Sequence, residues 1–169
     1  TIQTVGDVND LTPTLQGTSN EIGGTVTLII TDSEGAVQTI TTTVESDGHW
    51  DIEIPSALAQ GDFTVTASIT DAAGNDTTAN SSGNVDTITP VITVDALGLG
   101  NDSTPVISGT STEPEGTVVN IVITDSNGDE TPITATVDAN GNWQATSPEL
   151  PEGSYSVQAS ITDAAGNTD

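Results

Sequence analysis

The chain of 169 residues carries 25 acidic side chains and no Lys or Arg, so its formal net charge at pH 7 is −25. Proteins bind DNA, RNA and anionic membrane surfaces mainly through Lys and Arg side chains that contact phosphates. Because this chain has neither residue, we do not expect these partners. There is no cysteine, which removes disulfides and thiolate metal sites. No apolar run reaches the roughly eighteen residues that a membrane span needs, and we expect no direct membrane insertion.

High net charge with two Trp, one Tyr and one Phe is also typical of disorder. Residues 25–31, 63–70 and 118–124 argue against it, because they are rich in β-branched side chains, have the length of strands and are bounded by Gly, Asp, Asn and Pro. The sequence therefore predicts a folded, all-β chain. With no initiator Met and no secretory apolar region, we interpret it as an interior segment whose targeting signal lies elsewhere.

The stretch ASITDAAGN occurs at residues 67–75 and again, without change, 92 residues later at 159–167. Around it, the second half of the chain repeats the first at an offset of 92 or 93 residues. This period is too long for a solenoid and suits one small β-sandwich. We expect two tandem antiparallel β-sandwich domains, residues 1–86 and 87–169, in an elongated arrangement.

Seven strands are expected in the first copy, the last of them within residues 77–86. The second copy contains the first six, at residues 90–96, 105–110, 118–124, 133–138, 143–147 and 154–162. No segment of the second copy matches residues 77–86, so its last strand is expected to be absent. An open sheet edge of this kind offers self-association with another chain.

Trp50 and Trp143 occupy equivalent places, each after a Gly turn. Sugar stacking is one use for such a residue, but a Trp repeated in register is more typical of the core between two sheets, and Phe63 and Tyr155 are interpreted in the same way. The single histidine, His49, has no counterpart in the second copy. We interpret it as part of a turn and expect no enzyme activity.

Acidic and amide residues are expected to meet at one end of the second sandwich. An antiparallel chain reverses direction with each strand, which brings the incoming linker and alternate loops to the same end and places Asp86, Glu113, Asp163 and Asn167 together. Two carboxylates about 5 Å apart repel by about 3 kcal/mol at an effective dielectric constant near 20, so such a cluster needs a cation. Oxygen ligands without imidazole or thiolate favour Ca²⁺.

The repeated loop adds Asp71 and Asn75 as candidate calcium ligands in the first copy. The alternative is that DAAGN is only a turn, in which the Asp side chain accepts backbone hydrogen bonds and Gly takes a positive φ. We favour calcium, because the loop is repeated, the acidic loops converge and the chain has no basic residue.

A second acidic cluster is expected at the opposite end of the sandwich, where acidic and amide residues stand at alternate positions as at the start of a Ca²⁺-binding loop. The candidate ligands at this end, which are weaker, are Asp125, Asn127, Asp129, Asp10, Asp102 and Asp32. The first copy has Ala36 where the second has Asp129. A solvated hairpin turn is therefore the favoured interpretation here.

The ordered set TPVISGTS, EPEGTVV, TDSNG, DANGNW, ITDAAGN and VDTITP resembles the bacterial Ig-like repeats in the extender regions of giant RTX-type adhesins of Gram-negative bacteria. The resemblance covers nearly all of both copies. It implies that neighbouring Ig-like repeats of the same chain are the main partners, that the protein lies outside the cell on its surface, and that Ca²⁺ at the junctions stiffens the array.

Carried over by the same resemblance, the metal ligands are Asp86, Glu113, Asp163 and Asn167, and a corresponding set in the first copy is formed by Glu21, Asp71 and Asn75. The aspartate that would match Asp86 in that first set precedes Thr1, so the set is expected to be incomplete.

Three functions remain open from the sequence. The favoured one is a structural spacer of a secreted, surface-displayed adhesin. A glycan- or protein-binding Ig-like module is the alternative, and a matrix or filament subunit that assembles by strand exchange is the third.

Overall fold

The computed structural model describes residues 1–98 and 101–169 and divides the chain into two compact units, Thr1–Thr87 and Ile88–Asp169. Both units are built from β-strands, and the described residues form no helix. The expected all-β fold with two sandwich domains is confirmed. Each unit is described by itself below.

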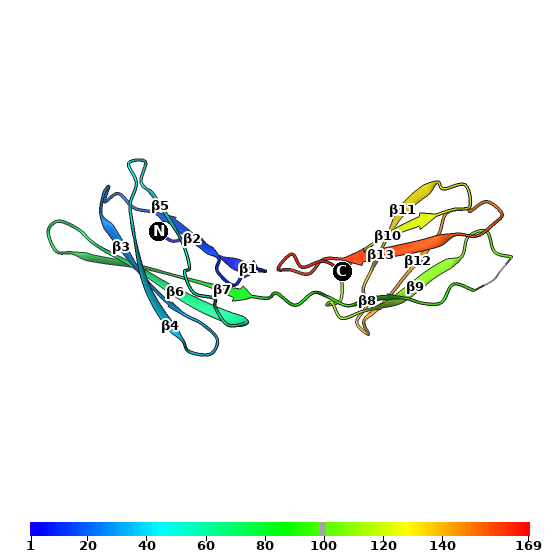
Figure 1. The fold of residues 1–169 in the computed structure, drawn as a ribbon, viewed down its shortest axis with the longest axis horizontal. Helices are drawn as coiled ribbons and strands as arrows, with labels where there is room; N and C mark the ends of the chain where they lie inside the picture. The colour runs from blue at the N-terminus through cyan, green and yellow to red at the C-terminus, as the bar shows by residue number, and fades with distance from the viewer. Residues whose placement is uncertain (99–100) are drawn as a thin grey trace. The chain divides into compact units, whose positions relative to one another are not determined.

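Unit 1 is a sandwich of two sheets (Figure 1). The larger sheet has the order β1-β7-β6-β3-β4 and the smaller one pairs β2 with β5. The bounds of the strands are β1 Gly6–Val8, β2 Thr14–Thr18, β3 Thr25–Thr31, β4 Val37–Thr43, β5 His49–Glu53, β6 Gly61–Thr70 and β7 Asp76–Val85. All pairs are antiparallel except β1 with β7.

The first segment of unit 1 contributes to both sheets. Ile2 bridges Gly17 of β2, whereas β1, a few residues later, pairs with β7 in the other sheet. The chain changes sheets at Gly6, whose φ of +74° is rarely adopted by residues with a side chain. The sequence analysis did not anticipate this parallel pairing.

Alternation of side chains places the core between the sheets. In β3, Val26, Leu28 and Ile30 are 3%, 0% and 0% exposed, while the residues between them face outward. Trp50 and Phe63 lie in the same core at 2% and 1% exposure. Their predicted core positions are therefore confirmed.

Unit 2 repeats this arrangement with fewer strands. One sheet has the order β11-β10-β13 and the other β12-β9-β8. Their bounds are β8 Ile92–Val94, β9 Val106–Ser111, β10 Val118–Thr124, β11 Glu130–Thr136, β12 Asn142–Thr146 and β13 Ser156–Ile161. All six predicted strands of the second copy are present, and among the described residues of this unit no strand corresponds to β7.

The core of unit 2 is centred on Trp143, which is 2% exposed and donates from its indole nitrogen to the carbonyl oxygen of Thr110 at 3.3 Å. Tyr155 is only partly buried, although it packs against the same core. The expectation for Tyr155 is thus met in part, because no strand like β7 covers it.

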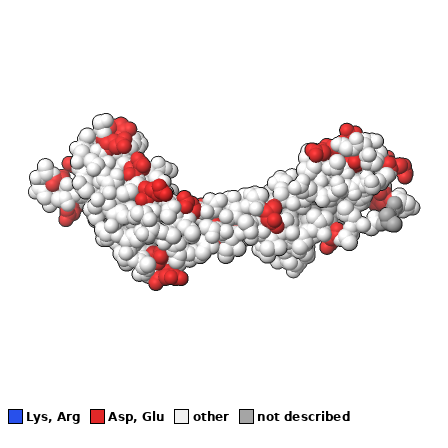
Figure 2. Space-filling view, viewed as in Figure 1, with Lys and Arg blue, Asp and Glu red and all other residues white. Residues whose placement is uncertain are grey.

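Acidic side chains are spread over the visible face of both units without a single basic one among them (Figure 2). Within the described residues, no helix is long and apolar enough to cross a membrane.

Candidate metal centre

The repeated loop folds as a compact turn around its aspartate. Oδ1 of Asp71 accepts hydrogen bonds from the backbone N–H groups of Ala73 and Asn75, both at 2.8 Å, and Oδ2 accepts one from the side-chain amide of Asn75, also at 2.8 Å. The backbone closes the loop, with Asp71 N–H donating to the Asn75 carbonyl at 3.0 Å. Gly74 takes a φ of +90°, which explains why the loop carries glycine at this position.

The second loop has the same geometry. Asp163 accepts the backbone N–H and the side-chain amide of Asn167, each at 2.8 Å, and Gly166 has a φ of +93°. The turn that the sequence analysis gave as the alternative is therefore the geometry of both loops. A turn of this kind fixes the carboxylate in place, so it is compatible with a ligand role.

These hydrogen bonds keep both carboxylates ionised. The side-chain amide of Asn75, followed by its backbone N–H, lowers the pKa of Asp71 below the ordinary value of 3.8. Desolvation raises the pKa of Asp163, but the hydrogen bonds from Asn167 outweigh it, so the pKa of Asp163 is also lowered. Both groups are thus anionic at neutral pH and available to a cation.

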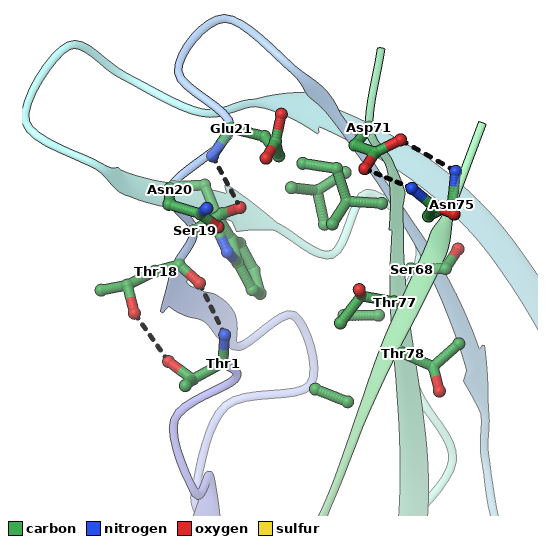
Figure 3. Close-up of a pocket in the computed structure, with 15 residues that line it drawn as sticks. Thr1, Thr18, Ser19, Asn20, Glu21, Ser68, Asp71, Asn75, Thr77 and Thr78 are labelled. Atoms are coloured by element: carbon green, nitrogen blue, oxygen red, sulfur yellow. Dashed lines mark hydrogen bonds between the residues drawn. The ribbon is translucent and has the colours of Figure 1, made fainter. Parts of the chain in front are cut away.

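In unit 1 the three expected residues line one cavity of about 300 Å³. Glu21, Asp71 and Asn75 lie on its wall together with Thr18 and Ser19, which carry uncharged hydroxyl groups (Figure 3). The loop of Glu21 is positioned by Ser19, whose Oγ accepts the Glu21 backbone N–H at 3.2 Å. The three residues of this set therefore border the same cavity.

In unit 2 the corresponding glutamate is held in the same way. The backbone N–H of Glu113 donates to Oγ of Ser111 at 3.1 Å. Glu113, Asp163 and Asn167 belong to unit 2, whereas Asp86 belongs to unit 1. The predicted four-residue set thus draws on both units, and its assembly stays a prediction.

The donor chemistry of the unit 1 cavity fits Ca²⁺ better than zinc or copper, because two carboxylates, an amide oxygen and hydroxyls supply only hard oxygen ligands. The amide nitrogen of Asn75 faces Asp71, which leaves its oxygen for another contact. The described residues contain no group of three or more His, Cys, Asp or Glu arranged to hold a metal. Amide, hydroxyl and backbone oxygens or water would therefore complete the six to eight ligands of calcium.

At the opposite end, Asp125, Asp10, Asp102 and Asp32 accept hydrogen bonds within their own loops, and Asp32 also accepts the backbone N–H of Ala59 at 3.2 Å. Asp125 Oδ1 accepts the backbone N–H groups of Asn127 and Asp129 at 2.8 and 3.0 Å. Asp10 and Asp102 each accept the backbone and hydroxyl groups of the threonine two residues later, and Asp32 accepts the N–H of Ala36 at 2.8 Å. This is the geometry of the favoured hairpin turns, and a metal there stays a prediction.

The sequence analysis did not single out Asp138, which forms the same kind of turn. Asp138 accepts the N–H groups of Asn140 and Asn142 at 2.8 and 2.9 Å, and these hydrogen bonds lower its pKa. The signal was present, since residues 138–142 read DANGN and share the D-x-x-G-N spacing of the repeated loop. That spacing predicts the turn, whereas only the neighbouring acidic groups distinguish a ligand loop from a plain one.

The model of the bacterial Ig-like domain family matches residues 6–87 and 93–169, which is nearly the whole chain. The chain therefore belongs to the bacterial Ig-like domain family and contains two of its domains. No curated protein matches the sequence at a significant level.

Solved structures similar to this pair of domains include segments of adhesins. The tetra-tandem repeat from the extending region of a large adhesion protein shares 33% identity over 99% of this chain and 45% of that chain, with a TM-score of 0.48. A Ca²⁺-stabilised adhesin that helps an Antarctic bacterium reach out and bind ice shares 26% identity over 96% of this chain and 43% of that one, with a TM-score of 0.43.

The FN1–FN3 domains of chicken CNTN1 share the fold at 16% identity and a TM-score of 0.51, over 98% of this chain and 59% of theirs. At 45% and 43% coverage, the chain spans less than half the length of the two adhesin structures.

Proposed function

We propose that the chain is a spacer segment of a bacterial adhesin displayed outside the cell, in which Ca²⁺ at the ends of the Ig-like units stiffens the array. The observation that carries the spacer role is the tandem repetition of one family domain, with 33% identity to an adhesin extending region over 99% of the chain. In such a segment the neighbouring repeats of the same chain are the partners.

The calcium part of the proposal rests on the loops. Glu21, Asp71 and Asn75 share one cavity in unit 1, and the two aspartate loops hold their carboxylates ionised in the same conformation. A bound Ca²⁺ would supply the positive charge that the chain lacks. In unit 2, Asp163 and Asn167 are the matching ligands, joined by Glu113 and Asp86.

The aromatic residues do not favour a sugar-binding function. Trp50, Trp143 and Phe63 lie in the cores at 2%, 2% and 1% exposure, so their faces are not available for stacking on a glycan.

Thermal unfolding in EDTA and in millimolar Ca²⁺ tests the proposal. A cation bound only by the folded state adds about 4 kcal/mol to the free energy of unfolding at a thousandfold excess over its dissociation constant, so the melting temperature is expected to rise. NaCl at matched ionic strength is the control for charge screening. Equal stabilisation by NaCl, or no change with Ca²⁺, would contradict the calcium role.

A matched pair of variants locates the effect. Glu21→Gln removes one charge from the cavity of unit 1 and is expected to reduce the Ca²⁺-dependent rise. Glu34→Gln makes the same chemical change on an exposed turn outside the cavity and is expected to leave the rise unchanged.

A further inference from the structure

The sequence contains two Asn-Gly pairs, Asn127-Gly128 and Asn140-Gly141, and both lie in turns of unit 2. Both asparagine side chains are exposed. The equivalent positions of unit 1 are Glu34 and Asp47, and each of these is also followed by glycine. Unit 2 therefore carries a neutral amide at two turn positions where unit 1 carries a carboxylate.

An asparagine that precedes glycine loses its side-chain amide without an enzyme. The backbone nitrogen of the glycine, after loss of its proton, attacks the asparagine Cγ, a cyclic succinimide forms, and the Cγ–Nδ2 bond breaks with release of ammonia. The reaction is fast for an amide because the two groups are adjacent in the same chain, and glycine has no Cβ that would obstruct the approach. Water then opens the ring at Cγ, which gives aspartate, or at the backbone carbonyl carbon, which gives isoaspartate.

The turn around Asn127 leaves its glycine open. The N–H of Gly128 donates to the carbonyl oxygen of Asp125 at 3.1 Å, so this bond must open before the nitrogen reaches the Asn127 side chain. Gly128 is exposed, and a Cβ built on it would meet nothing within 4 Å. Ser126, which precedes the reacting pair, anchors the turn to a neighbouring loop by donating from Oγ to the carbonyl oxygen of Glu152 at 3.2 Å. The peptide between Asn127 and Gly128 thus has room to rotate.

The turn around Asn140 holds its glycine more firmly. The N–H of Gly141 donates to the carbonyl oxygen of Asp138 at 3.0 Å, as in the other turn, but the carbonyl oxygen of Gly141 also accepts the N–H of Ser111 at 2.8 Å. A Cβ on Gly141 would stand 2.9 Å from the carbonyl oxygen of Ser111, and Trp143, two residues later, is buried in the core. Rotation at this position requires a further backbone hydrogen bond to open, so the same chemistry is slower here.

The fold accepts an acidic residue at position 127. The equivalent turn of unit 1 has the same two backbone hydrogen bonds to its aspartate, with Glu34 where unit 2 has Asn127. Aspartate at this position therefore leaves the turn in place. Isoaspartate lengthens the backbone by one carbon atom between the two N–H groups that Asp125 binds, so it disturbs the turn.

We propose that Asn127 is a site of spontaneous deamidation in the folded chain, with water as the co-reactant and ammonia as the product, and that it reacts before Asn140. The reaction adds a negative charge to the turn of residues 125–129.

The test is mass spectrometry of the chain of residues 1–169 during incubation in a mildly alkaline buffer, with fragmentation that assigns each change of mass to a residue. In the folded chain, Asn127 is expected to react about 5-fold faster than Asn140, which is the effect of one further backbone hydrogen bond that must open. In guanidinium chloride, where both turns are unfolded, the two rates are expected to become equal. Circular dichroism of the same samples measures the folded state.

Two matched variants locate the reaction. Asn127→Gln keeps the amide but lengthens the side chain by a methylene group, which makes the ring larger and slower to form. The faster of the two mass changes is therefore expected to disappear. Asn140→Gln makes the same change in the other turn and is expected to leave the faster mass change as it is.

The proposal is overturned if Asn140 reacts as fast as Asn127 or faster in the folded chain, or if Asn127 reacts in guanidinium chloride but not in the folded chain over the same period. It is also overturned if the ratio of the two rates is the same in both conditions, because the fold is then not its cause.

Discussion

At the residue scale, one aspartate geometry recurs in the loops. A D-x-x-G segment turns around its carboxylate, which accepts the N–H groups two and four residues later, as at Asp71, Asp125 and Asp138. The chain has no Lys or Arg to pair with these groups, so backbone amides stabilise their negative charge. In the two repeated loops the side-chain amide of Asn75 or Asn167 also binds the remaining carboxylate oxygen.

The first prediction concerns this amide. In Asn75→Ala the pKa of Asp71 is expected to move up toward its ordinary value, because the side-chain hydrogen bond of Asn75 is the largest cause of the lowering. Carboxyl ¹³C NMR over a pH titration measures it, with Asp163 in the same sample as the internal control. An unchanged Asp71 titration would show that the side-chain hydrogen bond is not the cause.

The second prediction gives the pH dependence of stability. A carboxyl whose folded pKa is lowered contributes stability that is present above its unfolded pKa and is lost as pH falls through the folded value. The contribution of Asp32, Asp71, Asp138 and Asp163 is therefore expected to be present above about pH 4 and to be lost as the pH falls below 3.8. Urea unfolding in metal-free buffer between pH 7 and 2 checks this. Stability that is constant down to pH 2 would contradict it.

At the element scale, the strands were predictable because each copy shows β-branched runs bounded by turn residues, and the repeat gives two examples of most of them. The core positions of Trp50 and Trp143 were predictable because the two residues occupy equivalent places in the two copies. The parallel pairing of β1 with β7 was not predictable, since it depends on a change of sheet at Gly6 within a short segment that has no hydrophobic alternation of its own.

The site was predictable only in part. Strand alternation indicates which loops share an end of the sandwich, and in unit 1 Glu21, Asp71 and Asn75 border the same cavity, while their role as ligands stays a prediction. The set containing Asp86 depends instead on how two separate units meet, which strand periodicity does not determine.

The third prediction tests close packing between strand and core. A Cβ at Gly109 of β9 would overlap the carbonyl oxygen of Thr93 and stand 2.6 Å from the ring of Trp143. Gly109→Ala is therefore expected to lower the free energy of unfolding of unit 2 by about 1–3 kcal/mol, as overpacked cores do.

Gly98→Ala is the matched control, because nothing lies within 4 Å of a Cβ at that position. Denaturant unfolding of the two variants compares them. Equal effects would show that β8 and Trp143 relax around the added methyl group.

The fourth prediction compares the two units. In a polypeptide of residues 1–169, β7 covers β6 in unit 1 and no described strand takes the equivalent place in unit 2, so unit 2 of this polypeptide is expected to open more readily. Native-state hydrogen exchange of the buried strands β3 and β10, which have seven residues each, measures the difference. Slower exchange in β10 than in β3 would contradict this expectation.

At the scale of the whole molecule, repetition and charge fit the proposed spacer. Two domains of one family follow each other in the chain, and a net charge of −25 keeps separate copies apart while creating a demand for cations. A spacer needs rigidity more than a specific pocket, and Asp86, one of the proposed Ca²⁺ ligands, lies next to the boundary between the two units in the sequence.

Small-angle X-ray scattering in Ca²⁺ and in EDTA measures this stiffening most directly. The account predicts a larger and better-defined maximum dimension in Ca²⁺, lost in EDTA and in Asp86→Ala or Glu113→Ala, while Glu115→Ala in the same loop as Glu113 behaves like the unaltered chain. A maximum dimension that is the same in Ca²⁺, in EDTA and in both ligand variants, with both units still folded, would contradict the claim that calcium stiffens the array.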